Sequence, residues 1–163
     1  MNKRIKKKQK IMKNKKLCKR YPFLIPRGWN ETPLWRLSKH DWRYTKPYEF
    51  TELVQMPEGW SRAFGKEMCE EIRQVLVKAN YLYDYRVVQI KEKYGSLRWY
   101  DAGAPSSIYR ELQEVINKYE EISERTCICC GRPATKISLG WISPFCDRCA
   151  GKLNERVKFK EID

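Results

Sequence analysis

The sequence contains a single histidine, His40, and this scarcity narrows the chemistry open to the chain. A His-Asn-His nuclease needs more than one histidine, and no motif places His40 beside a reactive cysteine. The motifs G-x-S-x-G, Walker and H-E-x-x-H are also missing. The acidic pairs Glu70–Glu71 and Glu120–Glu121 are predicted to lie on solvent faces. We therefore predict that the protein is not an enzyme. A metal-dependent carboxylate site assembled from distant residues is the alternative left open.

Long apolar runs are absent as well. No segment approaches the 18 or so consecutive apolar residues that a membrane-spanning helix needs, so no membrane partner is expected. No apolar stretch follows the charged N-terminus, as a secretory signal would require. The sequence therefore predicts a cytoplasmic protein. In the cytosol, paired cysteines more often bind metal or do redox work than form structural disulfides.

Acidic residues are missing from the first twenty positions, where eleven residues are Lys or Arg. The net charge of +14 belongs mainly to this segment, and the other 143 residues together carry +3. Such a block, with few apolar residues, is typical of a flexible tail that is disordered or a frayed helix. It can be a solubilising extension or an arm that lies on phosphates. The nucleic-acid-binding candidates are Lys3, Arg4, Lys6, Lys7, Lys8, Lys10, Lys13, Lys15, Lys16, Lys19 and Arg20.

Cysteine, by contrast, is concentrated near the C-terminus, where residues 127–149 hold five of the seven. Two C-x2-C pairs separated by fifteen residues have the spacing of a tetrahedral zinc site. Gly131, after the first pair, suits a tight turn because glycine tolerates a positive φ. Four thiolates leave no open coordination position, so one structural zinc is expected, with redox or disulfide use as the alternative. The predicted ligands are Cys127, Cys130, Cys146 and Cys149, and Cys129 is predicted to be a free thiol.

The residues around these cysteines predict a zinc ribbon. Ile137, Leu139 and Trp141 alternate with polar or small residues, which is typical of a strand between the two knuckles. Several cations lie close in sequence to the ligands. They can neutralise the charge of the metal site, or they can form a patch for an acidic partner. They are Arg125, Arg132, Lys136, Arg148 and Lys152.

Two helices are predicted from apolar residues that recur at steps of three and four. Residues 61–80 form the first, with Ser61 as its N-cap. Residues 105–123 form the second, which starts at Pro105. The expected buried positions of the first helix are Phe64, Met68, Ile72, Val75 or Leu76, and Ala79, with Cys69 at the edge of the stripe. Those of the second are Ile108, Leu112, Val115 or Ile116, Tyr119 and Ile122.

Residues 85–101 predict a β-hairpin that turns at Tyr94-Gly95. The register then pairs Ile90 with Trp99 and Glu92 with Leu97. One face is expected to carry Val88, Ile90, Leu97 and Trp99, and the other Lys91, Lys93 and Arg98. Residues 21–60 are rich in proline and aromatics, which predicts extended segments and turns. Their aromatics either pack on the core or form a base-stacking surface with Arg27, Arg36 and Arg43.

The expected fold is therefore α+β: two helices and a β-hairpin form a small core, followed by a C-terminal four-cysteine zinc ribbon and preceded by a disordered basic N-terminal tail. The corresponding division of the chain is a basic tail over residues 1–20, the core over 21–124, the ribbon over 125–152 and an extension over 153–163.

Part of the sequence resembles small, uncharacterised zinc-ribbon proteins encoded by phages and prophages of bacteria. The resemblance is carried by "KEKYGSLRWYD", by the helix that follows it, and then by "ERTCICCGRPA" and "GWISPFCDRC". The similarity covers roughly residues 18–150, and the Lys-rich start is the part it covers least. The resemblance implies a phage accessory protein acting in the cytoplasm of a bacterial host. It carries no established activity.

Two functional hypotheses follow. The basic tail and the ribbon favour association with nucleic acid, either DNA or RNA, or with a nucleoprotein complex. The nearly neutral, aromatic-rich body favours instead a protein-binding inhibitor of a host defence factor, such as an anti-CRISPR or other anti-defence protein. Salt sensitivity separates the two, because phosphate binding weakens steeply with salt and aromatic docking does not.

Overall fold

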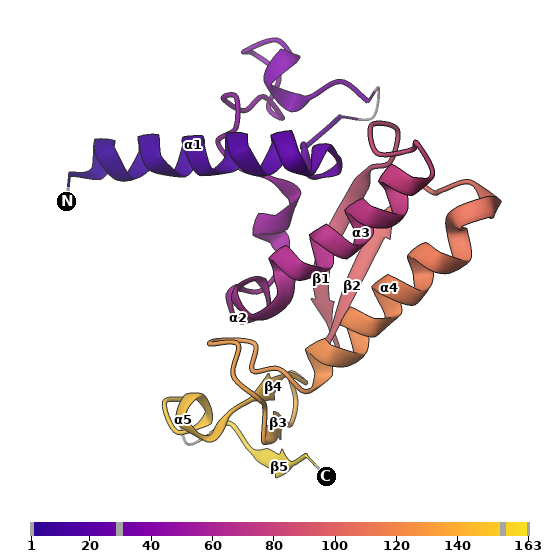
Figure 1. Cartoon of the computed structure of the whole chain (residues 1–163). Helices are drawn as coiled ribbons and strands as arrows, with labels where there is room; N and C mark the ends of the chain where they lie inside the picture. The colour runs from indigo at the N-terminus through magenta and orange to yellow at the C-terminus, as the bar shows by residue number, and fades with distance from the viewer. Residues whose placement is uncertain (1, 29–30, 154–155, 163) are drawn as a thin grey trace.

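The structure is a computed structural model, and it describes residues 2–28, 31–153 and 156–162. It contains helices and two small antiparallel sheets, so the expected mixture of helix and strand is confirmed (Figure 1). Trp29, part of the aromatic-rich segment, and the ends of the predicted tail and extension, Met1 and Asp163, lie outside the described residues. Within the described ranges, no helix is long and apolar enough to cross a membrane.

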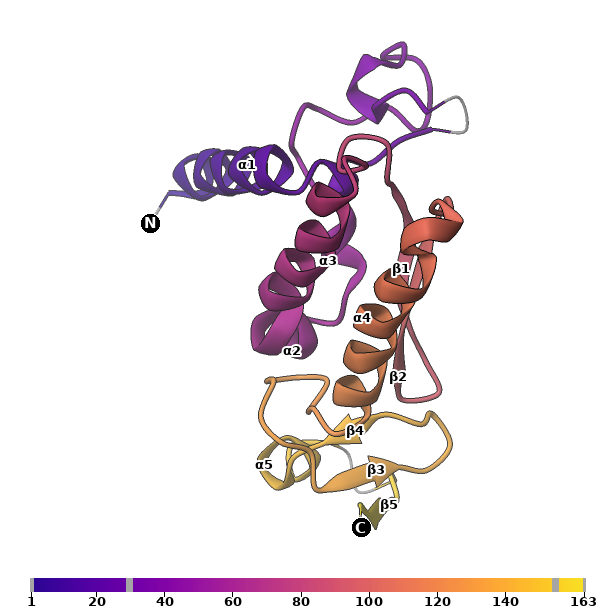
Figure 2. The same ribbon diagram turned by 45° about the vertical axis from the view of Figure 1, so that its right-hand side comes forward.

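The core lies between α3 (Lys66–Lys78), α4 (Ser106–Glu124) and the hairpin of β1 (Val87–Lys93) and β2 (Ser96–Asp101). The helix α4 packs against both α3 and β2, and a 3-10 turn over Glu52–Gln55 packs against β1 (Figures 1 and 2). The periodic apolar positions of both helices face this core. Each fully buried leucine there, such as Leu76 or Leu112, contributes about 1.5–3 kcal/mol.

Some predicted helix positions differ in the structure. Helical backbone starts earlier than Ser61, with α2 (Glu58–Trp60) after Pro57 and then a wider π-helical turn over Ser61–Gly65. The Ser61 N–H already donates to the Pro57 carbonyl at 2.9 Å, so Ser61 is inside the helix and is not its cap. At the other end, Ala79 is the exposed C-cap of α3. Ile122 is more than a third exposed, whereas Ser123 is fully buried.

The hairpin has the predicted register, with Ile90 opposite Trp99 and Glu92 opposite Leu97. Tyr94 and Gly95 have φ values of 55° and 82°, as a two-residue turn of the primed type requires. The prediction for Val88 was wrong. A bulge between Val87 and Gln89 leaves Val88 without a partner and 60% exposed, and turns Val87 into the core.

The basic segment is not disordered in the structure. Residues Lys3–Arg20 form α1, a helix that projects from the body at its N-terminal end (Figure 1). Its two ends favour the helix, because the Asn2 side chain accepts from the Arg4 N–H at 3.0 Å and Lys19 and Arg20 lie in the last turn.

Contacts with distant segments hold α1 in place. Asn14 is buried, and its amide donates to the carbonyls of Tyr48 at 3.0 Å and Glu49 at 3.2 Å. Cys18 is also buried, and Arg20 makes a bidentate pair with Glu70 at 2.8 Å. Composition predicted disorder because it reports only the local like-charge repulsion and not these contacts.

The segment between α1 and α2 contains 3-10 turns over Pro22–Leu24 and Leu34–Arg36, as its prolines and aromatics predicted. Tyr21, Phe23 and Trp60 are buried in the core. Trp42 is 91% exposed, so the aromatics of this segment divide between core and surface.

The C-terminal part is built from β3 (Lys136–Ser138), β4 (Pro144–Phe145), α5 (Asp147–Ala150) and β5 (Phe159–Glu161). The sheet order is β4-β3-β5, so the last strand adds an edge that the sequence did not predict. The predicted strand through Leu139 and Trp141 ends at Ser138. The chain turns at Gly140, with φ 93°, and leaves Trp141 78% exposed.

Candidate metal centre and basic surface

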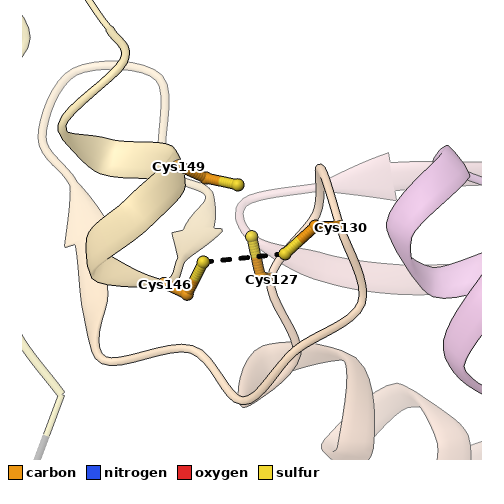
Figure 3. A group of neighbouring side chains, drawn as sticks. All are labelled: Cys127, Cys130, Cys146 and Cys149. Carbon is orange, nitrogen blue, oxygen red and sulfur yellow. Dashed lines mark hydrogen bonds between the residues drawn. The ribbon is translucent and has the colours of Figure 1, made fainter.

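The four predicted cysteine ligands converge at one point (Figure 3). Their sulfur atoms all lie within 4.8 Å of one another, and Cys130 Sγ is 3.6 Å from Cys146 Sγ. Zn–S bonds of about 2.3 Å in a tetrahedron place sulfurs roughly 3.8 Å apart, whereas a disulfide bond is only about 2.05 Å long. The group can therefore hold one metal ion without rearrangement of the chain.

Two local backbone motifs present these thiols. In the first knuckle, the Cys127 N–H donates to the Arg132 carbonyl at 2.7 Å and the Gly131 N–H donates to the Cys127 carbonyl at 2.9 Å. Gly131 has a φ of 78°, as its place after the pair predicted. In the second knuckle, the Cys149 N–H donates to the Cys146 carbonyl at 3.0 Å, at the start of α5.

The first knuckle is joined closely to the core. The Gly59 N–H of α2 donates to the Ile128 carbonyl at 2.9 Å, and the indole N–H of Trp60 donates to the Thr126 carbonyl at 2.8 Å. A Cβ on Gly59 would lie 2.3 Å from the Cys127 carbonyl oxygen, so only glycine allows this approach. The position of the metal site is therefore set by α2 as well as by the knuckle itself.

Hydrogen bonding and burial shift the pKa values of these thiols in opposite directions. A hydrogen bond with the Arg132 backbone lowers the pKa of Cys130 to about 7, while desolvation raises the pKa of Cys149 to about 12. A bound metal stabilises all four as thiolates, so binding releases protons. Burial alone raises the pKa of Cys18 to about 11, which suits an unreactive core residue. Cys129 is exposed and lies outside the ligand group.

All eleven cationic side chains singled out in the basic segment lie on α1, and all are exposed. Two of them pair with acids of the body: Lys7 with Glu49 at 3.1 Å, and Arg20 with Glu70. The other nine form no ion pair with any residue that the structure describes. They are Lys3, Arg4, Lys6, Lys8, Lys10, Lys13, Lys15, Lys16 and Lys19.

The cations near the ribbon cysteines divide into groups. Lys136 lies between Asp147 at 3.2 Å and Glu161 at 3.4 Å. Arg132, Arg148 and Lys152 instead line a hollow of about 340 Å³ together with two ligand cysteines. Arg62 lines the same hollow. Sequence reasoning missed it, because it lies far before the ribbon in the chain and no local pattern distinguishes it.

The sequence predicted that the acidic pairs face solvent, but in the structure three of these carboxylates also bind other side chains. Glu70 binds Arg20 and accepts from the Tyr21 hydroxyl at 3.0 Å, and Glu71 binds Lys118 at 2.7 Å. Glu120 pairs with Arg98 at 3.2 Å. Each of these three carboxylates thus has a structural partner, and together they join α1 to α3, α3 to α4, and α4 to the hairpin.

Comparison with known proteins gives no match to any protein-family model, curated protein or solved structure. The functional argument therefore rests on the residues and geometry of this chain.

Proposed function

We propose that the protein is a non-enzymatic, zinc-stabilised accessory protein of a bacteriophage that binds nucleic acid in the cytoplasm of its bacterial host. The phage setting comes from the sequence resemblance, and zinc is proposed as the metal because four sulfur ligands at this spacing favour it. Zinc in this closed site has a structural role and supplies no catalysis.

The observation that carries the proposal is the charge of α1. Eleven of its eighteen residues are cationic and none is acidic. An 18-residue helix is about 27 Å long, and duplex DNA carries one phosphate charge per roughly 1.7 Å of its axis. The helix is therefore long enough to follow several phosphates along one groove or strand.

The anchoring of α1 supports the same function. Asn14 and Cys18, four residues apart, hold one side of the helix against the body, and Arg20 anchors its C-terminal end, so its cations are presented in a fixed direction. A pre-ordered helix binds with less loss of conformational entropy than a disordered arm of equal charge. Phosphate contacts of this kind position a nucleic acid without reading its bases.

Replacing four cations of the helix tests the proposal. Lys8, Lys15, Lys16 and Lys19 are exposed, so changing all four to Gln should leave the fold intact. We expect the slope of log affinity against log salt to fall by about 3–4, for a labelled DNA duplex or for RNA. The matched control changes Lys78, Lys91, Lys93 and Arg110 to Gln and removes the same charge elsewhere. Equal slopes for wild type and both variants would contradict binding through α1.

A protein-binding inhibitor of a host defence factor is the second candidate, because one apolar surface favours it. Trp42 is 91% exposed at a cavity of about 570 Å³ that Leu34, Phe50 and Val88 also line. Exposed aromatics beside an apolar cavity are typical anchors of protein interfaces. In this reading, Trp42→Ala abolishes capture of a host protein after nuclease treatment, and the α1 variant does not.

A further inference from the structure

Two neighbouring hollows on the surface share Arg62. The first, here called the ribbon hollow, is lined by Arg62, Arg132, Arg148, Lys152 and the ligands Cys130 and Cys149. The second, the helix hollow, is about 630 Å³ in volume and includes Arg20, Arg62 and Lys66. Arg20 is the last residue of α1, so cationic side chains continue from the end of α1 to the metal centre.

Both views place α1, α2 and α5 on the same side of the molecule (Figures 1 and 2). Arg62 lies in the π-helical turn that follows α2, and Arg148 belongs to α5. The cations of the two hollows together are called the basic track. They are Arg20, Lys66, Arg62, Arg132, Arg148 and Lys152.

The ribbon hollow is the most cationic part of this track. Its four cations come from the turn after α2, the first knuckle and the α5 segment, and among the described residues no carboxylate lines it. Glu58 pairs with Arg62 from outside the hollow, and this pair is largely exposed to solvent. An exposed pair of this kind is weak, so Arg62 can exchange Glu58 for another anion.

The metal centre offsets only part of this positive charge. Zinc with four thiolates carries about −2, which is less than the charge of the four cations around the hollow. In the helix hollow the balance is closer, because Glu67 and Glu70 also line it. Glu70 pairs with both Arg20 and Arg73, so the charge of Arg20 is partly offset there. The helix hollow is therefore the weaker part of the track, and the strongest anion site lies beside the metal centre.

We infer that the ribbon hollow binds backbone phosphates of the nucleic acid whose binding to α1 is proposed above, so that one strand follows the basic track from α1 to the metal centre. Arg62, Arg132 and Arg148 supply guanidinium groups that can grip phosphate oxygens in bidentate fashion, and Lys152 adds a point charge. The inference deepens the proposed function and rests on it. It also gives the metal a role in binding, because the two knuckles set the spacing of Arg132 and Arg148.

The test compares the full-length zinc-loaded protein with Arg132→Ala/Arg148→Ala/Lys152→Ala. Binding to a fluorescein-labelled DNA duplex and to labelled single-stranded RNA is measured by anisotropy between about 50 and 200 mM salt. Three lost phosphate contacts lower the slope of log affinity against log salt by about 2–3. The drop in affinity across this salt range is therefore roughly 40-fold smaller for the variant than for the wild type. At about 100 mM salt its affinity is lower by at least about tenfold.

Controls separate this effect from damage to the fold. Lys78→Ala/Lys93→Ala/Arg110→Ala removes equal charge from exposed positions outside the track and leaves the slope unchanged. Metal content and thermal unfolding of each variant are measured alongside. Arg62→Ala/Lys152→Ala avoids both knuckle loops, and it lowers the slope by about 1–2 even where the triple variant fails to fold.

Three outcomes decide the matter. A lower slope in the track variants, with the control unchanged, supports the inference. Unchanged slopes in folded track variants, while the α1 variant loses affinity, overturn the inference and leave the proposed function standing. Failure of the wild type to bind either probe at about 50 mM salt overturns both.

Discussion

At the scale of single residues, Glu52 is unusual because it is a carboxyl that is only 7% exposed and pairs with no cation among the described residues. Gln55 donates a hydrogen bond to it, and burial raises its pKa to about 7. In the unfolded chain a glutamate titrates near 4.3. Between these two pH values the native state holds a proton that the unfolded state has released, so the stability of the protein falls as pH rises through this window.

Replacing Glu52 by Gln removes this penalty. We expect no change in the free energy of unfolding near pH 4.5 and a gain of about 1–2 kcal/mol at pH 8. The gain is smaller than the full pKa shift implies, because Glu52 lines the cavity of about 570 Å³ beside Trp42, which is open to water. Urea unfolding at both pH values measures the gain. Glu121→Gln, at an exposed position of α4, serves as the control and should show no such pH dependence. An equal effect of Glu52→Gln at both pH values would refute a raised pKa.

The cysteines give a second prediction at this scale. Cys130→Ser leaves three sulfur ligands and should lose most of the bound zinc, with a loss of stability above about 3 kcal/mol because metal binding is coupled to folding of the ribbon. Cys129→Ser is the neighbouring control and should keep about one zinc per chain and change stability by less than about 0.5 kcal/mol. Metal analysis and thermal unfolding of both variants measure these two effects. Equal metal content in both variants would contradict the ligand assignment.

At the scale of elements, the joint between α2 and the first knuckle leaves no room for a side chain at Gly59. Gly59→Ala places a Cβ 2.3 Å from the Cys127 carbonyl oxygen, and backbone on both sides has to shift. We expect a loss of about 1–3 kcal/mol and weaker metal retention against a chelator. Gly151→Ala, where the nearest atom is 3.4 Å away, is the matched control. Equal stability of the two variants would mean that the ribbon is not fixed by α2.

The elements differ in how far the sequence predicts them. The helices α3 and α4 and the hairpin follow from periodicity, because their burial patterns are local and regular. The helix α1 does not, because its order depends on Asn14 meeting carbonyls more than thirty residues later. The bulge at Val88 was missed for a related reason, since strict alternation holds only where every residue has a partner.

At the scale of the whole molecule, the four ligand cysteines could be predicted because C-x2-C spacing is a local signature of a shared site. The basic track could not be predicted in the same way. Arg20, Arg62 and Arg148 are far apart in the sequence, and the fold alone brings them to one side. The third strand of the ribbon sheet, β5, was missed because three residues carry too little pattern to indicate a partner.

The described contacts join α1, the core and the ribbon. Arg20 and Tyr21 connect α1 to α3 through Glu70, and Trp60 and Gly59 connect α2 to the first knuckle. Charge on α1 and charge beside the metal centre are therefore held in a defined relation. This arrangement is compatible with the proposed binding of an extended polyanion.

The most direct test of nucleic-acid binding is capture by the tagged, zinc-loaded protein from bacterial lysate, with and without nuclease treatment. The account predicts that nucleic acid is the main material retained, that it is lost after nuclease treatment, and that it elutes as salt rises from about 50 to 200 mM. The α1 variant should retain far less. The account would be contradicted by two observations together: no nucleic acid is retained before nuclease treatment, and a defined host protein stays bound after it and at high salt.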